Sequence, residues 1–162
     1  MASPRLATTF AVFMLVSSLS STGYSLRFAV VGDSQLNFDN PLREPKIFIK
    51  LLKDMERQGH RPAFLLHAGD IITGWTSDRG VLQRQYRNYL SAVKGLPFPL
   101  HNAIGNHEGY DAQSSALFRK YIGPAWQSFS EDGWHFILLD NASDAHYKTL
   151  GPEQEAWLKK DL

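Results

Sequence analysis

The sequence predicts an α/β domain of layered sheets and helices, and three observations lead to this prediction. Over residues 26–104, short apolar segments alternate with segments of helical periodicity in the order β-α-β-α-β. Three of the apolar segments end at a glycine that is followed by a polar residue. Farther along, a hairpin-type sequence precedes a final helical segment. Strands that alternate with helices are typical of parallel sheets, whose connections need about a dozen residues or more.

The first two strands and the helix between them come first. Residues 26–31 (LRFAVV) form a β-rich run that is expected to be a buried strand. Residues 45–58 place apolar side chains on one helical face, and Gly59 is a natural C-terminal stop. We expect a second strand over residues 63–67.

The second helix and the third strand follow the same pattern. Ser77 or Asp78 can cap a helix whose apolar positions continue to Val93, and Gly95 can end it. Two prolines then confine the next strand to about residues 100–104.

The last third of the chain has a different pattern. A short helix is expected over residues 114–122. Strands at 127–131 and 134–140 flank the dipeptide Asp-Gly at 132–133, which strongly favours a two-residue hairpin turn. A final helix begins with Pro152 in its first turn, where proline is favoured.

Composition excludes several classes of function. The chain has 162 residues, of which 43% are hydrophobic and 20% charged, near the average of globular domains. It contains no cysteine, which excludes disulfides, thiolate metal sites and cysteine nucleophiles. The formal charge of +1 provides no basic surface, so no nucleic-acid partner is expected.

Residues 1–25 are expected to be a secretory signal peptide. Arg5 provides a positive charge, residues 10–16 (FAVFMLV) form a short apolar core, and small residues follow from 17 to 23. This run is shorter than the roughly 20 residues of a membrane span, so no stable span is expected. Cleavage near residues 21–25 would place the mature chain, residues 26–162, in the periplasm or outside the cell. The alternatives are an uncleaved membrane anchor and a plain N-terminal extension.

Metal-binding side chains follow the three glycine-terminated segments. Asp33, Asp70 and Asn106 each come directly after a glycine, at nearly equal spacings of 37 and 36 residues. The carboxyl ends of strands border the functional crevice in α/β sheets, so these side chains are expected to gather there. Two carboxylates and one amide oxygen suit Mg²⁺, Mn²⁺ or iron, and added imidazole would admit Zn²⁺. The alternative is that all three are ordinary turn residues.

Three sequence blocks occur in a fixed order, namely 32–35 (GDSQ), 69–73 (GDIIT) and 105–108 (GNHE). In this order they resemble the calcineurin-like metallophosphoesterase family. Residues 150–158 (LGPEQEAWL) resemble the helix before the family's fourth block, so the resemblance extends over residues 26–162. It implies a two-sheet sandwich with helices outside, an α/β/β/α architecture. It also implies hydrolysis of a phosphate mono- or diester by a water that metal ions activate, without a phospho-enzyme.

The resemblance assigns the metal ligands. Two divalent metal ions (Mn, Fe, Zn or Mg) would be bridged by Asp70, with Asp33 on the first and Asn106 on the second. Gln35 stands where the family usually has histidine. It would supply an amide oxygen to the first metal, or it would bind nothing.

The resemblance makes His107 the catalytic residue. It would protonate the leaving alkoxide, which is otherwise a poor leaving group, or stabilise it electrostatically. Glu108 is expected to support the site rather than take part in the chemistry. Trp75, Tyr110 and Trp126 either line a substrate cleft or pack within the domain.

Two departures from the family pattern bear on activity. Thr73 stands where the second block often ends in Asp, a residue that in many members orients the motif histidine. The three histidines of the family's fourth and fifth blocks do not occur before Leu162, so the domain is expected to be incomplete at its C-terminus. The alternative to an active enzyme is therefore a catalytically inactive remnant, at most a binding module. A nuclease of the same superfamily is a third hypothesis, which the neutral charge disfavours.

Overall fold

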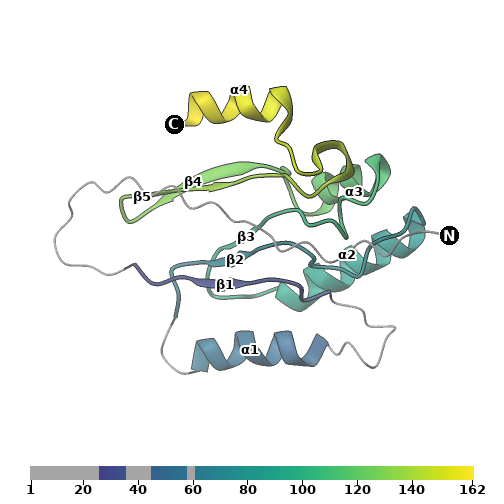
Figure 1. Ribbon diagram of the computed structural model, residues 1–162. Coiled ribbons are helices and arrows are strands. Elements are labelled where there is room, and N and C mark those ends of the chain that lie inside the picture. Colours follow the sequence, from purple (N-terminus) through teal and green to yellow (C-terminus); the bar gives the residue numbers. More distant parts are fainter. Residues whose placement is uncertain (1–25, 36–44, 58–60) are drawn as a thin grey trace.

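The computed structural model describes residues 26–35, 45–57 and 61–162, and its centre is a parallel three-stranded sheet (Figure 1). The strands lie side by side in the order β1-β2-β3. Their bounds are β1 (Ala29–Val31), β2 (Leu65–His67) and β3 (Leu100–Asn102).

The register of the strands aligns their carboxyl ends. Val31 at the end of β1 lies opposite His67, and His67 at the end of β2 lies opposite Asn102. The three segments that follow the strands therefore start level with one another, at the same edge of the sheet. This arrangement is the one expected for parallel strands that carry a site at their carboxyl ends.

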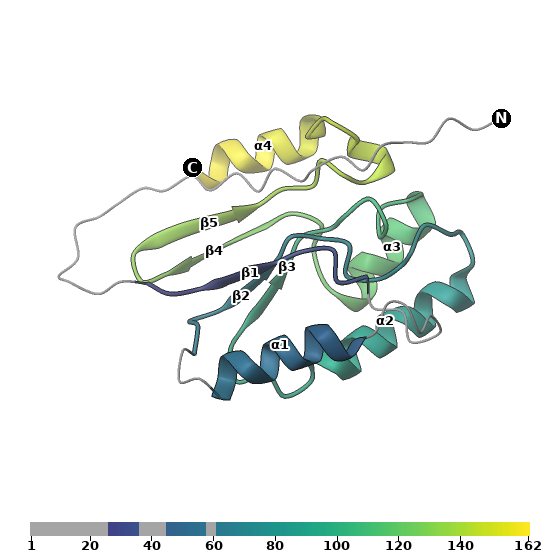
Figure 2. The ribbon, with the colours of Figure 1, turned by 60° about the horizontal axis from the view of Figure 1, so that its bottom comes forward.

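Two helices cover one face of this sheet. They are α1 (Pro45–Arg57) and α2 (Arg79–Val93), which lie on the same side in Figure 2. Asp78 caps α2 as expected, because its side chain accepts a hydrogen bond from the backbone N–H of Val81. The helices and the sheet share a buried apolar cluster that includes Phe48, Leu52, Leu65, Leu82, Tyr86 and Tyr89.

An antiparallel hairpin covers the opposite face of the sheet. Strands β4 (Gln127–Glu131) and β5 (Trp134–Leu138) are joined by a turn in which Asp132 and Gly133 have φ values of 49° and 79°. Two positive φ values are typical of the Asp-Gly hairpin turn, so the predicted hairpin is confirmed. A second buried cluster joins the hairpin to the sheet and includes Phe64, Leu66, Ala103, Phe136 and Leu138.

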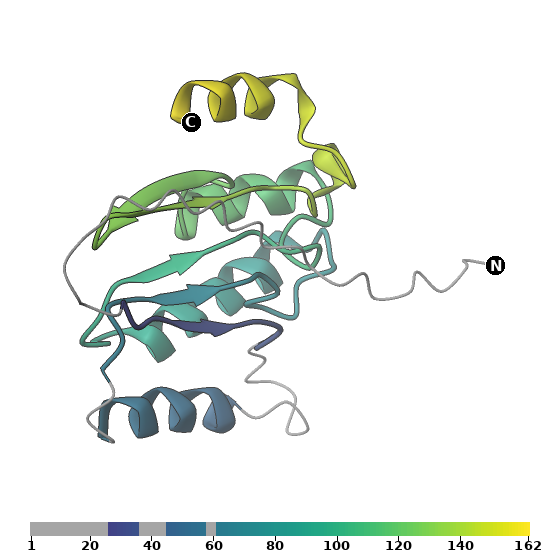
Figure 3. The same cartoon turned by 60° about the vertical axis from the view of Figure 1, so that its left-hand side comes forward.

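The last helix, α4 (Gly151–Asp161), lies over the outer face of the hairpin (Figure 3). The layers therefore run from helices through the parallel sheet and the hairpin to a second helix. Gln154 is the one buried residue of α4. It accepts a hydrogen bond from the N–H of Asp140 (2.7 Å) and donates one to the carbonyl of the same residue (2.8 Å).

The far end of α4 is also attached by polar contacts. Asp161 accepts a hydrogen bond from Ser128 Oγ of β4 (2.6 Å). Its other carboxylate oxygen lies 2.7 Å from His135 Nε2 of β5. The first turn of α4 is thus fastened to the segment after β5, and its C-terminal end is fastened to the hairpin strands.

The observed bounds differ from the predicted ones at several ends. The three parallel strands have three residues each and are shorter than predicted. Helix α3 (Ala112–Tyr121) begins before residue 114, because Asp111 caps it by accepting from the N–H of Ser114 (2.7 Å). A short 3₁₀ turn, η1 (Asp144–His146), precedes α4. Among the described helices, none has the length and apolar character needed to cross a bilayer.

Candidate active site

Three loops meet at the carboxyl edge of the parallel sheet, and each carries a predicted metal ligand. Asp33 follows β1, Asp70 follows β2 and Asn106 follows β3. The backbone N–H of Asp33 donates to the carbonyl of Gly69 (3.1 Å), and that of Gln35 donates to the carbonyl of Asp70 (2.8 Å). These two bonds join the first loop to the second.

The third loop is pressed against the second at Gly105. A Cβ added at this position would lie 2.1 Å from Asp70 Oδ1 and 2.4 Å from the backbone nitrogen of Asp70. Only glycine allows so close an approach. The backbone N–H of His107 also donates to Asp70 Oδ1 (3.2 Å). Asp70 therefore contacts both neighbouring loops.

A buried carboxylate, Glu108, holds the second and third loops together. Its side chain is fully buried and accepts backbone hydrogen bonds from Asp70 (2.9 Å), Ile72 (3.0 Å) and Gly105 (2.9 Å). Burial, followed by the charge of Asp70, raises the pKa of Glu108 to about 8, although the three N–H donors act in the opposite direction. The contacts agree with the supporting role expected for this residue.

The loop backbone adopts a conformation that most side chains avoid. The φ angles are +53° at Asp33, +40° at Gln35 and +55° at Asp70. Asp enters this left-handed region more readily than most residues, whereas Gln has no such preference. Each such residue costs on the order of 1–3 kcal/mol and persists where its surroundings enforce it, as they often do at functional sites.

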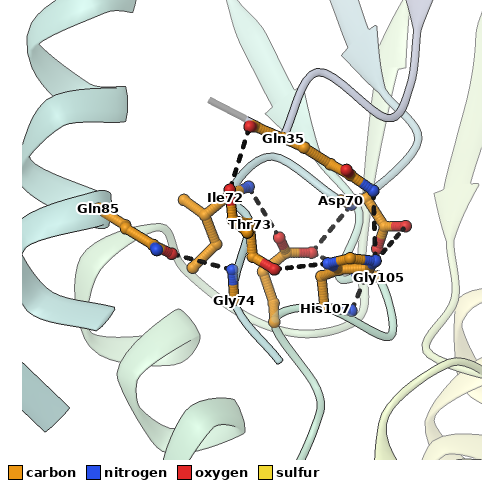
Figure 4. A network of polar contacts seen from close by, with 9 residues as sticks. Gln35, Asp70, Ile72, Thr73, Gly74, Gln85, Gly105 and His107 are labelled. Carbon is orange, nitrogen blue, oxygen red and sulfur yellow. Dashed lines mark hydrogen bonds and ion pairs between the residues drawn. The ribbon is translucent and has the colours of Figure 1, made fainter. Parts of the chain in front are cut away.

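His107 is held between two polar groups (Figure 4). Its Nδ1 lies 2.6 Å from the carbonyl oxygen of Thr73, and its Nε2 lies 3.2 Å from the side-chain nitrogen of Gln35. A carbonyl only accepts, so Nδ1 carries the proton of the neutral ring and Nε2 accepts from the amide. The backbone of Thr73 thus orients the ring at a position where the family often uses the side chain of Asp.

The predicted metal ligands provide oxygen atoms. In residues 26–35, 45–57 and 61–162, no three His, Cys, Asp or Glu side chains cluster in a way that would hold a metal ion. The pKa of Asp70 is nevertheless raised. Burial and the nearby Asp33 carboxylate raise it, and the charge of His107 lowers it in part. A divalent cation beside the two carboxylates would stabilise their ionised forms. The donor set therefore fits a hard cation that accepts carboxylate and amide oxygens.

The structure also shows contacts that the sequence did not reveal. His67 is fully buried, and its Nε2 lies 2.9 Å from Ser34 Oγ, between two predicted ligands. Burial lowers the pKa of His67 to about 4. A histidine inside an apolar strand is the only sequence signal for this contact, and it does not identify Ser34 as the partner. Gln85, whose Oε1 accepts from the N–H of Gly74 (2.9 Å), has no such signal.

The remaining histidines in the described residues have structural contacts. His101 stacks on Phe129 with 3.6 Å between ring centroids, and His146 lies against Trp126. His135 contacts Asp161, as described above. His60 lies outside the described residues.

Comparisons with known proteins identify the family. A curated relative, the manganese-dependent ADP-ribose/CDP-alcohol diphosphatase of Xenopus tropicalis, is 25% identical over 111 residues, or 68% of this chain and 32% of the relative. The chain thus spans about a third of that relative's length. A solved structure, a dimetal phosphatase from Danio rerio, is 20% identical with a TM-score of 0.46, and the match covers 65% of this chain and 40% of that one. The calcineurin-like phosphoesterase family matches residues 26–158, so the chain belongs to this family and is by homology a hydrolase.

Proposed function

We propose that the chain hydrolyses a phosphate mono- or diester with the help of divalent metal ions. The observation that carries this proposal is the meeting of Asp33, Asp70 and His107 at aligned strand ends. Asp70 Oδ1 accepts from the backbone of His107, and Asp70 Oδ2 lies 3.9 Å from His107 Nε2. A carboxylate that suits a metal ion and an imidazole that suits proton transfer are thus adjacent.

The metal ions would be held by oxygen atoms of the three loops. Asp33, Asp70 and Asn106 are the proposed ligands, with the side-chain carbonyl of Gln35 as a fourth donor. When bound, the ions would neutralise phosphate charge and lower the pKa of an attacking water. The family uses a two-metal centre, and the named relative depends on manganese. Oxygen donors likewise favour Mn²⁺ or Mg²⁺ over Zn²⁺.

His107 would deliver a proton to the leaving oxygen. The carbonyl of Thr73 keeps a proton on Nδ1 in either charge state, so the second proton of an imidazolium sits on Nε2. Nε2 is therefore the donor atom. The hydrogen bond from the amide of Gln35 must then be exchanged for one to the leaving oxygen, because two donors cannot face each other.

Hydrolysis of chromogenic esters tests the proposal. The proposal requires the full chain with Mn²⁺ to release nitrophenol from p-nitrophenyl phosphate or its bis-ester, and ADP-ribose belongs among the substrates to be tested because of the relative's name. Asp70→Asn should abolish turnover, whereas Glu155→Gln, on the exposed side of α4, should leave it unchanged. A wild-type chain that binds Mn²⁺ but hydrolyses none of these would instead support the inactive remnant, acting at most as a binding module.

We also infer that the observed layers correspond to the α/β/β/α sandwich of the family. The support is the sequence of helices, parallel sheet, hairpin and outer helix in Figure 1. A crystal structure of a longer family member would test it. If the hairpin strands do not continue into a second sheet there, the inference is wrong.

Residues 1–25 are proposed to be an export signal. The support is the charge of Arg5 ahead of the apolar run 10–16. N-terminal sequencing of the chain from fractionated cells tests this. A mature N-terminus near residues 21–25 in the periplasm or medium is expected, and an uncut chain retained in the cytoplasm would contradict it.

A further inference from the structure

An exposed tryptophan, Trp75, lies directly on the proposed acid. Its ring is 4.9 Å from the imidazole of His107, between centroids, and meets it edge to face at 64°. Its backbone N–H donates to the carbonyl of His107 (3.0 Å). Trp75 is nevertheless 47% exposed. Large aromatic side chains usually stabilise a fold by being buried. The ring is therefore held at the site without being part of a buried cluster.

The backbone around Trp75 is held in an unfavourable conformation. The φ angles are +45° at Gly74 and +52° at Trp75. A Cβ on Gly74 would lie 2.0 Å from the carbonyl oxygen of His107, so only glycine fits. The N–H of Gly74 is fixed from the other side by Gln85 of α2. A bulky residue in the left-handed region is rare, and such conformations are maintained mainly at ligand and catalytic sites.

A second exposed aromatic side chain belongs to an adjoining segment. Tyr110 is 41% exposed. The segment after Trp75 is joined to the segment after Tyr110, because Ser77 Oγ donates to Asp111 Oδ2 (2.5 Å). The two loops that border His107 therefore each present an exposed aromatic residue.

We propose that Trp75 is a stacking platform for a flat aromatic group on the leaving side of the substrate. The inference rests on the proposed function, because the role of His107 as the acid places the leaving group beside Trp75. An indole face binds planar rings by stacking, largely independently of which ring is presented. The substrate class is thus a phosphate ester or anhydride whose leaving group carries an aromatic ring. That ring is either a nucleobase or a simple aryl group.

Three variants separate stacking from other effects. Trp75→Phe keeps an aromatic ring. Trp75→Asn removes the ring, while Asn tolerates the left-handed backbone. Leu51→Ala, on the solvent-facing side of α1, removes an apolar side chain that is 44% exposed. Thermal unfolding should show that all three are folded.

Steady-state hydrolysis by the Mn²⁺-loaded full chain gives the first readout. Substrates are AMP, p-nitrophenyl phosphate and glycerol phosphate, which lacks a ring. Trp75→Asn should raise KM for the aromatic substrates about 5- to 150-fold, the range measured for loss of one stacked base. KM for glycerol phosphate should not change, and Trp75→Phe and Leu51→Ala should resemble wild type. If KM in Trp75→Asn rises only for AMP, the stacked group is a nucleobase. If KM also rises for the nitrophenyl ester, any aryl group can stack. An equal loss for glycerol phosphate would overturn the proposal, because Trp75 would then act only through His107.

Binding to the chelator-treated chain, which cannot turn over if metals are required, gives a second readout. By calorimetry, AMP should bind at least about fivefold more tightly than ribose 5-phosphate. This preference should vanish in Trp75→Asn and persist in Trp75→Phe. No preference in the wild type would overturn the platform. A clear preference in a chain that hydrolyses nothing would uphold the platform while the proposed function fails.

Discussion

At the scale of single residues, Glu108 links the stability of the site to pH. Burial raises its pKa from 4.5 to about 8, so the folded chain binds this proton more tightly than the unfolded chain does. Its stabilising contribution is therefore complete below pH 4.5 and is lost as the pH rises through about 8.

Glu108→Gln should destabilise the metal-free chain more at pH 5 than at pH 9. The expected difference is about 4 kcal/mol, because a pKa that rises from 4.5 to about 8 corresponds to several kcal/mol, most of which falls between pH 5 and pH 9. Urea denaturation in the presence of a chelator measures it, with Glu131→Gln on the exposed end of β4 as the control. A cost that does not vary with pH would show that Glu108 does not titrate in this range.

His67 is expected to act in the opposite direction. Burial lowers its pKa from 6.5 to about 4, so the unfolded chain takes up the proton first as the pH falls. The contribution of the neutral ring is present above pH 6.5 and is lost toward pH 4, by about 3 kcal/mol. His67→Gln should flatten this acid limb in denaturation curves at pH 7 and 4.5. A variant as acid-sensitive as the wild type would contradict the assignment.

The sequence predicts where some site residues lie, but it does not predict the hydrogen-bond partners of others. Asp33 and Asp70 could be placed at one edge because parallel strands in register have level ends. The partners of His107 could not be predicted from the sequence, because the contacts with Gln35 and the carbonyl of Thr73 depend on how two distant loops fold. For the same reason, sequence could not identify the three N–H donors of Glu108.

At the scale of elements, α4 depends on its polar attachments. The hydrogen bond from Ser128, and after it the contact with His135, lower the pKa of Asp161, so its carboxylate is ionised near neutral pH. Asp161→Ala removes both contacts, and the end of α4 should fray. Trypsin should then cut at Lys159 and Lys160 several-fold faster, as followed by mass spectrometry.

The control for that experiment lies on the same helix. Glu155 is exposed and can be replaced by alanine without loss of a described hydrogen bond. Glu155→Ala should be cut at the wild-type rate. Equal rates for Asp161→Ala and Glu155→Ala would mean that the contacts of Asp161 do not hold the end of α4.

Element boundaries show which signals were local. The hairpin was predicted correctly because its turn is set by two adjacent residues, Asp132 and Gly133. The start of α4 was predicted for a similar reason, since Pro152 lies in its first turn. The ends of the parallel strands were not predicted correctly, because a strand ends where its neighbours stop pairing. The end of each strand therefore depends on three segments that are far apart in the sequence.

At the scale of the whole molecule, the metal-free site opposes folding. Burial and the nearby Asp33 carboxylate both raise the pKa of Asp70, so its ionised form is disfavoured in the folded chain. Asp70→Asn removes the charge but keeps an oxygen for the N–H of His107. We expect the metal-free variant to melt about 3 °C above wild type, as expected for a gain of less than about 1 kcal/mol.

With Mn²⁺ bound, the wild type should melt at a higher temperature than Asp70→Asn. Binding to the folded state alone raises Tm with concentration, so Mn²⁺ should stabilise the wild type, and EDTA should cancel the effect. Asp70→Asn should not respond, whereas Glu155→Gln should respond as the wild type does. Differential scanning fluorimetry measures all three. A full Mn²⁺ response in Asp70→Asn would remove Asp70 from the ligand set.

The bonds between the loops also limit how such a site can diversify. The first loop is tied to the second by backbone hydrogen bonds, and the second is tied to the third through Trp75 and His107. An insertion in one loop would displace its neighbours, so changes of loop length should be tolerated only in concert. Exchange of single exposed side chains leaves these ties intact. New substrate preferences would therefore arise at positions such as Trp75, on a frame of constant length.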